Sequence, residues 1–380
     1  MAEEPVPQDE NLRLAELRFH ANKGKVEAAA ELRKAIVERL ALPLLHKVSK
    51  ELNWERDSAL EDSLQQTIDT KVKEMEDKLK DAEENLGESE VRDALNKLTD
   101  FYVQIWDREK AIQYCEKTLA ATVGLGQKLD LIFGMIRLGL SEKDYGYVKQ
   151  NIEKAREMIE RGGDWERRNR LKVYEATFLM ACRNLKDAAF LFLDSLATFS
   201  ASELYSYKKY VSYTVLTCMQ SVDRPTLKEK VANSPEVLSV LFEEPVLHKF
   251  FEALVQCDYK TYMSCLPEIM DAVADDYYLS VHSNYVGREL RVTGYAQFLA
   301  SYQSVKLAAM SASFGVGPDY LDLELSRFIA AGRLNCKIDK VSGIVEATRP
   351  DARNSIYQNT IKQGDLLLNR IQKLSRVIDM

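Results

Sequence analysis

The sequence is short of the residues that interrupt helices. Among its 380 residues, no proline lies between Pro43 and Pro225, and no glycine lies between Gly24 and Gly87. Turns between strands draw on glycine, proline, asparagine and aspartate, so a stretch this poor in them excludes a fold built mainly of sheets. The shortage predicts a mostly α-helical chain.

Long apolar runs and a signal peptide are also missing. No stretch of eighteen apolar residues without charge occurs, so we expect no transmembrane helix. The opening residues, MAEEPVPQDE, are acidic and contain proline, whereas a signal peptide is basic and then apolar. We therefore expect a disordered acidic tail over residues 1–10 and a protein of the cytoplasm and nucleus.

An excess of positive charge is absent. The net charge is −7, and acidic and basic residues are interspersed along the chain. Nucleic-acid and anionic-membrane binders need a basic surface, so the sequence argues against both partners. The six cysteines form no CxxC pair, and we expect them to be small buried side chains; they are Cys115, Cys182, Cys218, Cys257, Cys265 and Cys336.

The residue patterns of common enzymes do not occur. The four histidines, His20, His46, His248 and His282, form no HxH or HExxH pattern that could hold zinc. There is no P-loop, and GVGPDY fails the dinucleotide pattern because a proline follows its second glycine. Cys115 has no histidine nearby in the sequence, although the fold could bring a partner close. We therefore predict no enzyme, with no catalytic residue, cofactor or metal ligand.

An amphipathic helix is predicted between Arg56 and Leu86. Apolar residues there advance by three or four positions, and charged residues fill most gaps. The stripe consists of Leu60, Leu64, Ile68, Val72, Met75, Leu79, Ala82 and Leu86. This spacing fits a packed solenoid helix at least as well as a coiled coil, and we assign residues 11–90 to N-terminal helices.

A repeat follows over residues 91–284. Polar turn residues at Asp107, Asp144 and Asn184 lie 37 and 40 residues apart. Each is followed four positions later by a small or apolar residue, namely Ala111, Val148 and Ala188. Two helices and a turn at this period predict a tetratricopeptide-like (TPR-like) α-solenoid, although any array of helical hairpins can align in this way. The usual glycine before the turn is missing, which suggests degenerate units, and Pro225, Pro235 and Pro245 predict short helices.

Residues 285–350 have the pattern of a winged helix. The run RELRVTGYAQFLASY predicts a helix, SVKLAAMSASF a shorter one, and Pro318–Ala331 a third that ends before Gly332. The segments LNCKID and IVEAT, with a glycine-containing turn between them, predict a β-hairpin. The third helix carries Asp319, Asp322 and Glu324 against Arg327 alone, which disfavours DNA and favours docking to protein through the hairpin edge.

The last segment, residues 351–380, predicts one long helix. Its apolar stripe contains Ile361, Leu367, Leu368, Ile371, Leu374 and Ile378. Because it follows a completed domain, the stripe has two possible fates. It either folds back or forms a bundle with helices of other subunits.

The winged-helix stretch LAAMSASFGVGPDYLDLELSRFIAAGRLNCKIDKVSGIVEAT, followed by this long helix, resembles the PCI family. Members of that family are subunits of the 26S proteasome lid, the COP9 signalosome and a translation initiation complex. The solenoid segment VYEATFLMACRNLKDAAFLFLDSLATF is similar to a proteasome-lid member. The resemblance implies a non-catalytic scaffold that joins neighbouring PCI subunits and supports ubiquitin-dependent protein degradation. A PCI subunit of the COP9 signalosome and a winged-helix nucleic-acid adaptor are the alternatives.

The resemblance also implies partners and contact residues. The partners would be other PCI subunits and a metal-dependent deubiquitinase in a hetero-oligomer, with no cofactor, nucleic acid or membrane. Lateral contacts would involve the third helix of the winged helix and the hairpin, with Leu334, Cys336, Ile338, Ile344 and Val345 as the contact residues of the hairpin region. Contacts of the C-terminal helix bundle would involve Leu367, Ile371, Leu374 and Ile378.

Overall fold

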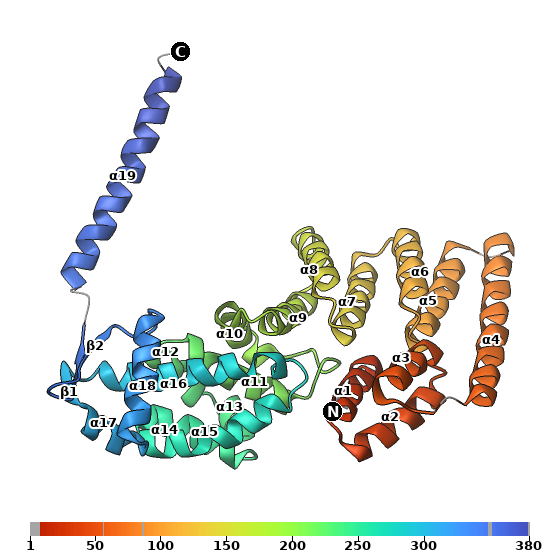
Figure 1. Ribbon diagram of the computed structural model, residues 1–380. Coiled ribbons are helices and arrows are strands. Elements are labelled where there is room, and N and C mark those ends of the chain that lie inside the picture. The colour runs from red at the N-terminus through yellow and green to blue at the C-terminus, as the bar shows by residue number, and fades with distance from the viewer. Residues whose placement is uncertain (1–7, 56, 86, 349–351, 379–380) are drawn as a thin grey trace. The chain divides into compact units, whose positions relative to one another are not determined.

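We analysed a computed structural model, which describes residues 8–378 except 56, 86 and 349–351. The expected mostly helical fold is confirmed, with nineteen α-helices and three short strands over these ranges (Figure 1). The chain divides into two compact units, which we describe separately. The first contains Met1–Phe251 and Pro267–Val286, and the second contains Glu252–Leu266 and Gly287–Met380.

The first unit begins with three helices, α1 (Glu10–Asn22), α2 (Val26–Glu38) and α3 (Leu42–Leu52). Disorder was expected over residues 1–10, but residues 8–10 are ordered, while residues 1–7 lie outside the described part. The Asp9 side chain accepts a hydrogen bond from the Asn11 amide and so caps α1. The Asp9 amide also donates to the Glu203 carbonyl at 2.8 Å. These contacts fix the start of α1 because they satisfy backbone groups that a helix end leaves free.

The predicted amphipathic helix is α4 (Ser58–Asn85), which packs against α5 (Glu88–Gln104). Leu64, Ile68 and Ala82 are its buried residues, and all three belong to the predicted stripe. The other side of α4 is exposed, as expected for an outer helix of a solenoid.

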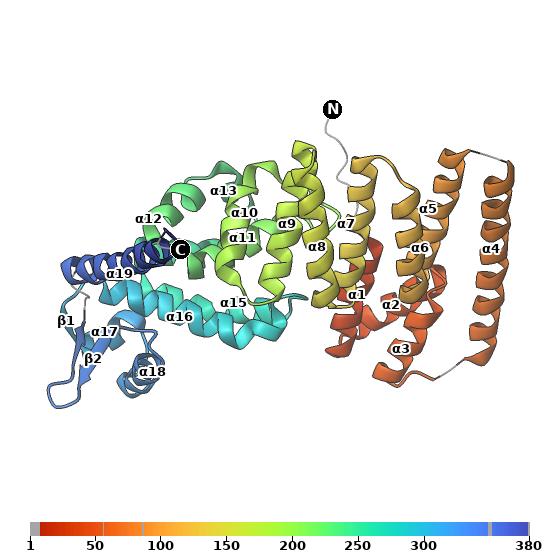
Figure 2. The same cartoon turned by 90° about the horizontal axis from the view of Figure 1, so that it is seen from above.

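The predicted repeat is confirmed as a row of helical hairpins (Figure 2). The hairpins pair α5 with α6 (Arg108–Ala121), α7 (Leu125–Ser141) with α8 (Tyr145–Glu160), and α9 (Trp165–Ala181) with α10 (Leu185–Asp194). Asp107, Asp144 and Asn184 are the N-caps of α6, α8 and α10. The residues four positions later, Ala111, Val148 and Ala188, are fully buried. The spacing in the sequence therefore reported the hairpin geometry correctly.

The turn that lacks glycine has the left-handed backbone nevertheless. Trp106, Lys143 and Arg183 adopt φ values of 64°, 58° and 66°. This conformation costs a residue with a Cβ roughly 1–2 kcal/mol. Each side chain makes a tertiary contact in return. The Trp106 indole donates to Glu142 at 2.9 Å, Lys143 donates to the Tyr277 carbonyl at 3.1 Å, and Arg183 lies over the Tyr285 ring.

Glu142 joins three parts of the first unit. Its carboxylate accepts hydrogen bonds from Lys47 of α3 at 2.9 Å, from Trp106 and from Arg108 at 3.1 Å. Arg108 also pairs with Asp144 in the next turn of the solenoid. Burial alone would raise the pKa of Glu142, but these donors together lower it below its ordinary value. The carboxylate thus connects an N-terminal helix to two successive hairpin turns.

The remainder of the first unit contains short helices, as the prolines predict. After α11 (Tyr207–Ser221) come α12 (Arg224–Leu227), the π-helical turn η2 (Lys228–Ala232) and α13 (Pro235–Leu241). The helices α14 (Pro245–Gln256), α15 (Tyr259–Ala274) and α16 (Ser283–Leu299) follow, and each of them is divided between the two units. The short 3₁₀ segments η1 (Leu196–Thr198) and η3 (Ser280–His282) complete this region.

The segment after α15 contacts the beginning of the chain. Tyr277 donates its hydroxyl to the Ser141 carbonyl at 2.9 Å, and its ring meets Phe19 of α1 edge-on. The neighbouring Asp276 accepts a hydrogen bond from the Tyr213 hydroxyl at 2.5 Å. Helix α1 itself packs against α7. Two segments more than 250 residues apart therefore meet at the α7 turn of the solenoid.

The second unit contains the winged helix. Strands β1 (Ser304–Lys306), β2 (Cys336–Asp339) and β3 (Ile344–Ala347) form an antiparallel sheet in the order β1-β3-β2. Helices α17 (Leu307–Phe314) and α18 (Pro318–Ala330) accompany the sheet (Figure 1). Part of the sequence prediction was wrong here, because SVK was expected to be helical. Val305 instead pairs with Val345, so these residues form β1 and the helix begins at Leu307.

A glycine follows each helix of the winged helix, and the one after α18 was expected. Gly315 follows α17 with φ of 67°, and Gly332 follows α18 with φ of 68°. Pro318 occupies the first turn of α18, where its missing amide hydrogen costs little. The buried side of α18 consists of Leu321, Leu325 and Phe328, and Ile329 packs against them. The last helix, α19, spans Ala352–Ile378.

We predict that Glu142→Gln lowers the free energy of unfolding of the full chain at pH 7 by about 1–3 kcal/mol. The change removes the negative charge that its three hydrogen-bond donors share. Because the folded-state pKa is lowered, this stabilisation exists above the unfolded-state pKa of about 4.3. It disappears as the pH falls through the lower folded-state value. Urea unfolding followed by circular dichroism should therefore show a difference at pH 7 that shrinks below about pH 4.

The matched control is Glu109→Gln, because Glu109 is exposed in the adjacent helix α6. We expect it to change stability by no more than about 0.5 kcal/mol at either pH. An equal effect of both variants would contradict a special role for Glu142.

A second prediction concerns the left-handed turn at Arg183. We expect Arg183→Ala to be less stable than Arg183→Gly by about 1 kcal/mol, because both lose the contact with Tyr285 but only alanine keeps the Cβ. The melting temperatures of the two variants measure this difference. If alanine matched or exceeded glycine, the turn would not be under backbone strain.

Candidate protein-docking surfaces

Helix α19 presents the largest set of exposed apolar side chains in the described chain. The side chains predicted for bundle contacts, Leu367, Ile371, Leu374 and Ile378, are 52–72% exposed. Five further apolar residues of the same helix are at least half exposed, namely Ile356, Tyr357, Ile361, Leu366 and Leu368. An apolar face of this extent is typical of a helix that packs against another polypeptide.

The apolar residues of α19 follow a heptad pattern. Positions 357, 364, 371 and 378 alternate with 360, 367 and 374, so one seam runs along the helix. Its last two heptads place isoleucine and leucine alternately, at Ile371, Leu374 and Ile378. This alternation is typical of coiled-coil packing. Gly364 lies in the seam, where the lack of a side chain lets a neighbouring helix approach closely.

The predicted lateral contact residues need a correction. Leu334, Cys336 and Val345 are buried in the core of the winged helix, with exposed fractions of 5% or less. Ile338 packs against the same core, and Ile344 is half-buried. The prediction that these side chains form a surface is wrong for the three buried residues. The hydrophobic face of the hairpin covers α17 and α18 within the same domain, which the alternating pattern alone could not distinguish from a docking face.

The exposed parts of the winged helix lie elsewhere. Strand β2 is an edge of the sheet, so one side of its backbone has no strand beside it in the described residues. On α18, Tyr320 and Leu323 are 50% and 58% exposed. They lie opposite the buried residues Leu321 and Leu325. The helical period of the sequence already puts Tyr320 and Leu323 on this outer side, but we did not predict them as contact residues. These two features form the candidate lateral surface.

Two of the three acidic residues of α18, Asp322 and Glu324, have partners inside the domain. Glu324 is buried and accepts hydrogen bonds from Arg291 and from the Tyr295 hydroxyl, each at 2.6 Å. Asp322 pairs with Lys340 of the hairpin turn at 3.0 Å. Two of the three negative charges that disfavoured DNA are therefore paired within the fold. These pairs hold α18 against α16 and the hairpin.

The groups considered for catalysis lack a reactive environment. Burial, with a smaller contribution from the charge of Asp100, raises the pKa of the Cys115 thiol to about 12. A thiol with this pKa is almost entirely protonated at neutral pH and is a poor nucleophile. Across residues 8–378, apart from the undescribed gaps, no cluster of three histidine, cysteine or acidic side chains could hold a metal ion. His248 of α14 lies beside the Phe242 ring, and the His282 ring forms a hydrogen bond with the Ala181 carbonyl.

None of the helices in the described part of the chain is both long enough and apolar enough to span a membrane.

Comparison with protein families gives three matches. Residues 57–230 match the model "26S proteasome subunit RPN7", and residues 267–349 match "PCI domain". Residues 357–378 match "26S proteasome regulatory subunit RPN7/PSMD6 C-terminal helix". The last range coincides with the heptad seam of α19.

Similar proteins extend over nearly the whole chain. The 26S proteasome non-ATPase regulatory subunit 6 of Dictyostelium discoideum is 43% identical over 381 residues, covering 100% of both chains. The protein of that name from Oryza sativa subsp. japonica is 48% identical, over 86% of this chain and 84% of its own. The 26S proteasome regulatory subunit RPN7 of Saccharomyces cerevisiae is 38% identical, over 85% of this chain and 76% of its own. With its helical solenoid, PCI domain and C-terminal helix, the chain belongs to the RPN7/PSMD6 family of 26S proteasome regulatory subunits.

Proposed function

We propose that this protein is a non-catalytic scaffold subunit of the 26S proteasome lid, which joins neighbouring PCI subunits and supports ubiquitin-dependent protein degradation. The observation that carries the proposal is the exposed heptad seam of α19, in the range that matches the family's C-terminal helix. A seam of this kind becomes stable only when other helices cover it. The work of the subunit is therefore to hold partners together.

The energy available from the seam supports this role. Covering one large apolar side chain that is about half exposed contributes roughly 1–1.5 kcal/mol. The four predicted bundle residues together then supply roughly 4–6 kcal/mol, before the cost of association. An isolated helix is marginal in water, so helix formation and association support one another.

The winged helix supplies a second contact. We propose that other PCI subunits dock laterally on the edge of β2 and on the α18 face that carries Tyr320 and Leu323. An edge strand can extend into the sheet of a neighbour through backbone hydrogen bonds. The buried Glu324–Arg291 pair and the more exposed Asp322–Lys340 pair hold this face in position.

The partners in this proposal are other lid subunits, among them a metal-dependent deubiquitinase that supplies catalysis in a hetero-oligomer. The relatives from Dictyostelium discoideum and Oryza sativa subsp. japonica are named as non-ATPase regulatory subunits, which fits a structural role. They belong to the proteasome and lend no support to a COP9 signalosome subunit. All six cysteines are free, as in a reducing compartment, which supports a place in the cytoplasm and nucleus.

We predict that replacing Leu367, Ile371, Leu374 and Ile378 together by serine leaves a folded subunit that no longer enters the complex. The side chains are exposed in the free chain, so their loss costs little folding energy but removes the seam. Co-sedimentation of the tagged variant with proteasome particles from cells measures incorporation. Thermal unfolding of the purified chain checks the fold.

The matched control changes Lys362, Asp365, Asn369 and Arg376 to serine, on the opposite side of the same helix. We expect this variant to be incorporated nearly normally. Normal incorporation of the seam variant would refute a bundle built on these residues.

The lateral contact gives a separate prediction. Leu323→Asp places a charge on the exposed face of α18 and should weaken association with neighbouring subunits by at least about tenfold. Because Leu323 is exposed, its free energy of unfolding should change by less than about 0.5 kcal/mol. Pull-down of purified neighbouring subunits at graded concentrations measures the loss. Unchanged association would show that this face of α18 is not the lateral contact surface.

A further inference from the structure

The starts of α7 and α9 carry exposed apolar side chains in the first unit. Val123 precedes α7 and is 85% exposed, Leu125 begins α7 and is 42% exposed, and Trp165 begins α9 and is 68% exposed. Figure 2 shows α7, α8 and α9 side by side in the row of hairpins. We call these three side chains the Trp165 surface. It belongs to the first unit and is therefore distinct from the docking surfaces on α19 and the winged helix.

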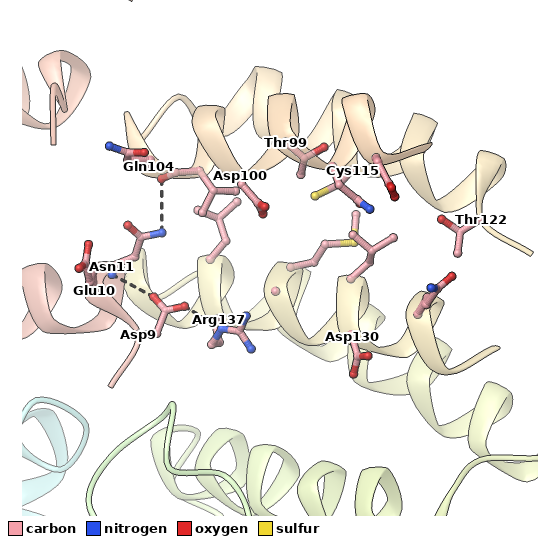
Figure 3. Close-up of a pocket in the computed structure, with 18 of the residues that line it drawn as sticks. Asp9, Glu10, Asn11, Thr99, Asp100, Gln104, Cys115, Thr122, Asp130 and Arg137 are labelled. Carbon is pink, nitrogen blue, oxygen red and sulfur yellow. Dashed lines mark hydrogen bonds and ion pairs between the residues drawn. The ribbon is translucent and has the colours of Figure 1, made fainter. Parts of the chain in front are cut away.

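A two-point ion pair connects these two helix starts. Arg167 of α9 donates to both carboxylate oxygens of Asp130 in α7, at 3.1 and 2.7 Å. Its remaining nitrogen donates to Asp164 at 2.7 Å. Figure 3, a close-up of the cavity beside α7, shows the Asp130 carboxylate directed away from Cys115 of α6. A planar contact of this kind fixes orientation as well as distance, so it holds the start of α9 against α7.

Glycines bring the same two regions close together. A Cβ atom added at Gly126 would lie 3.1 Å from the Arg167 guanidinium group, so the missing side chain makes room for it on α7. A Cβ atom added at Gly162 would lie 3.8 Å from the Leu125 side chain, which places the α8–α9 turn against α7. The Trp165 surface is therefore preorganised, and a partner that binds it does not have to order it first.

Three cations next to the Trp165 surface have no acidic partner. Lys128 follows Leu125 by three positions, and Arg168 follows Trp165 by the same spacing, which places each pair on one side of its helix. Arg161 lies at the end of α8. None of the three cations forms an ion pair with another described residue.

The acids of these two turns are mostly occupied. Residues 122–130 and 160–170 contain four acids. Three of them pair with Arg167 or Arg170, namely Asp130, Asp164 and Glu166. Glu160 is the fourth, and it is exposed. The unpaired charges around the Trp165 surface are therefore mainly positive.

We propose that Trp165 binds in an apolar pocket, rimmed by carboxylates, on a folded neighbouring subunit. This contact rests on the proposed scaffold function and is a third docking surface of the subunit. A tryptophan that is 68% exposed projects from the start of its helix, so the partner supplies the hollow. Tryptophan and arginine side chains dominate many protein interfaces because they bury a large area in such pockets. Carboxylates on the rim pair with Arg161 and Arg168 and orient the two surfaces as they meet.

Hydroxyl-radical footprinting of the full chain tests this contact, because radicals oxidise a tryptophan side chain that solvent can reach. Oxidation of Trp165 is measured by mass spectrometry in the purified subunit and in proteasome particles isolated from cells. Trp106, which is 2% exposed, is the internal reference for a buried tryptophan. We expect Trp165 oxidation to fall by about tenfold or more on assembly, because the centre of an interface is desolvated. Equal oxidation in both samples would overturn the proposal.

A charge reversal tests the acidic rim. Arg168→Glu should raise the oxidation of Trp165 in the particle by about threefold or more, because like charges then face each other. Its melting temperature should not change, since Arg168 is exposed. The matched control is Lys186→Glu, an exposed site in the first turn of α10, which should leave Trp165 protected. Full protection of Trp165 in the Arg168 variant would refute an acidic partner.

The outcome is separable from that of the scaffold proposal. Incorporation of the subunit is tested by the variant of the α19 seam, which leaves the Trp165 surface unchanged. If the seam variant fails to assemble while Trp165 of the wild type stays as exposed in the particle as in the free chain, the scaffold function stands and the third docking surface is refuted.

Discussion

The buried carboxylate of Glu142 is the interaction on which the order of the first unit depends. A solenoid is held by contacts between neighbouring hairpins, and each contact alone is small. Glu142 joins α3 to two consecutive turns through Lys47, Trp106 and Arg108. It thereby connects the last of the three N-terminal helices to the repeats.

The turns that lack glycine also connect neighbouring elements through single side chains. Trp106, Lys143 and Arg183 occupy a backbone conformation that suits glycine, yet each contributes a side chain to a neighbouring element. Glycine would relieve the strain but would lose the contact. At these turns a strained backbone is accepted because the side chain contacts a neighbouring element. This explains why the glycine of the usual repeat pattern is missing here.

Local features of the fold were predictable from the sequence, and its pairings were not. The N-caps at Asp107, Asp144 and Asn184 and the glycine cap after α18 follow from spacing and side-chain chemistry. The inward direction of Leu334, Cys336 and Val345 could not be derived, because alternation shows that a strand has two faces but not which face meets the core. Strand β1 was missed because its pairing with β3 depends on residues about forty positions away.

The contact between α1 and the segment after α15 has a consequence for how the protein is made. A ribosome releases the first helix long before Asp276 and Tyr277 have been synthesised. Until then, the side of α1 that carries Phe19 lacks its aromatic neighbour. The nascent chain therefore emerges with an incomplete first unit. Its maturation must wait for the arrival of a distant stretch, during which molecular chaperones have an apolar face to bind.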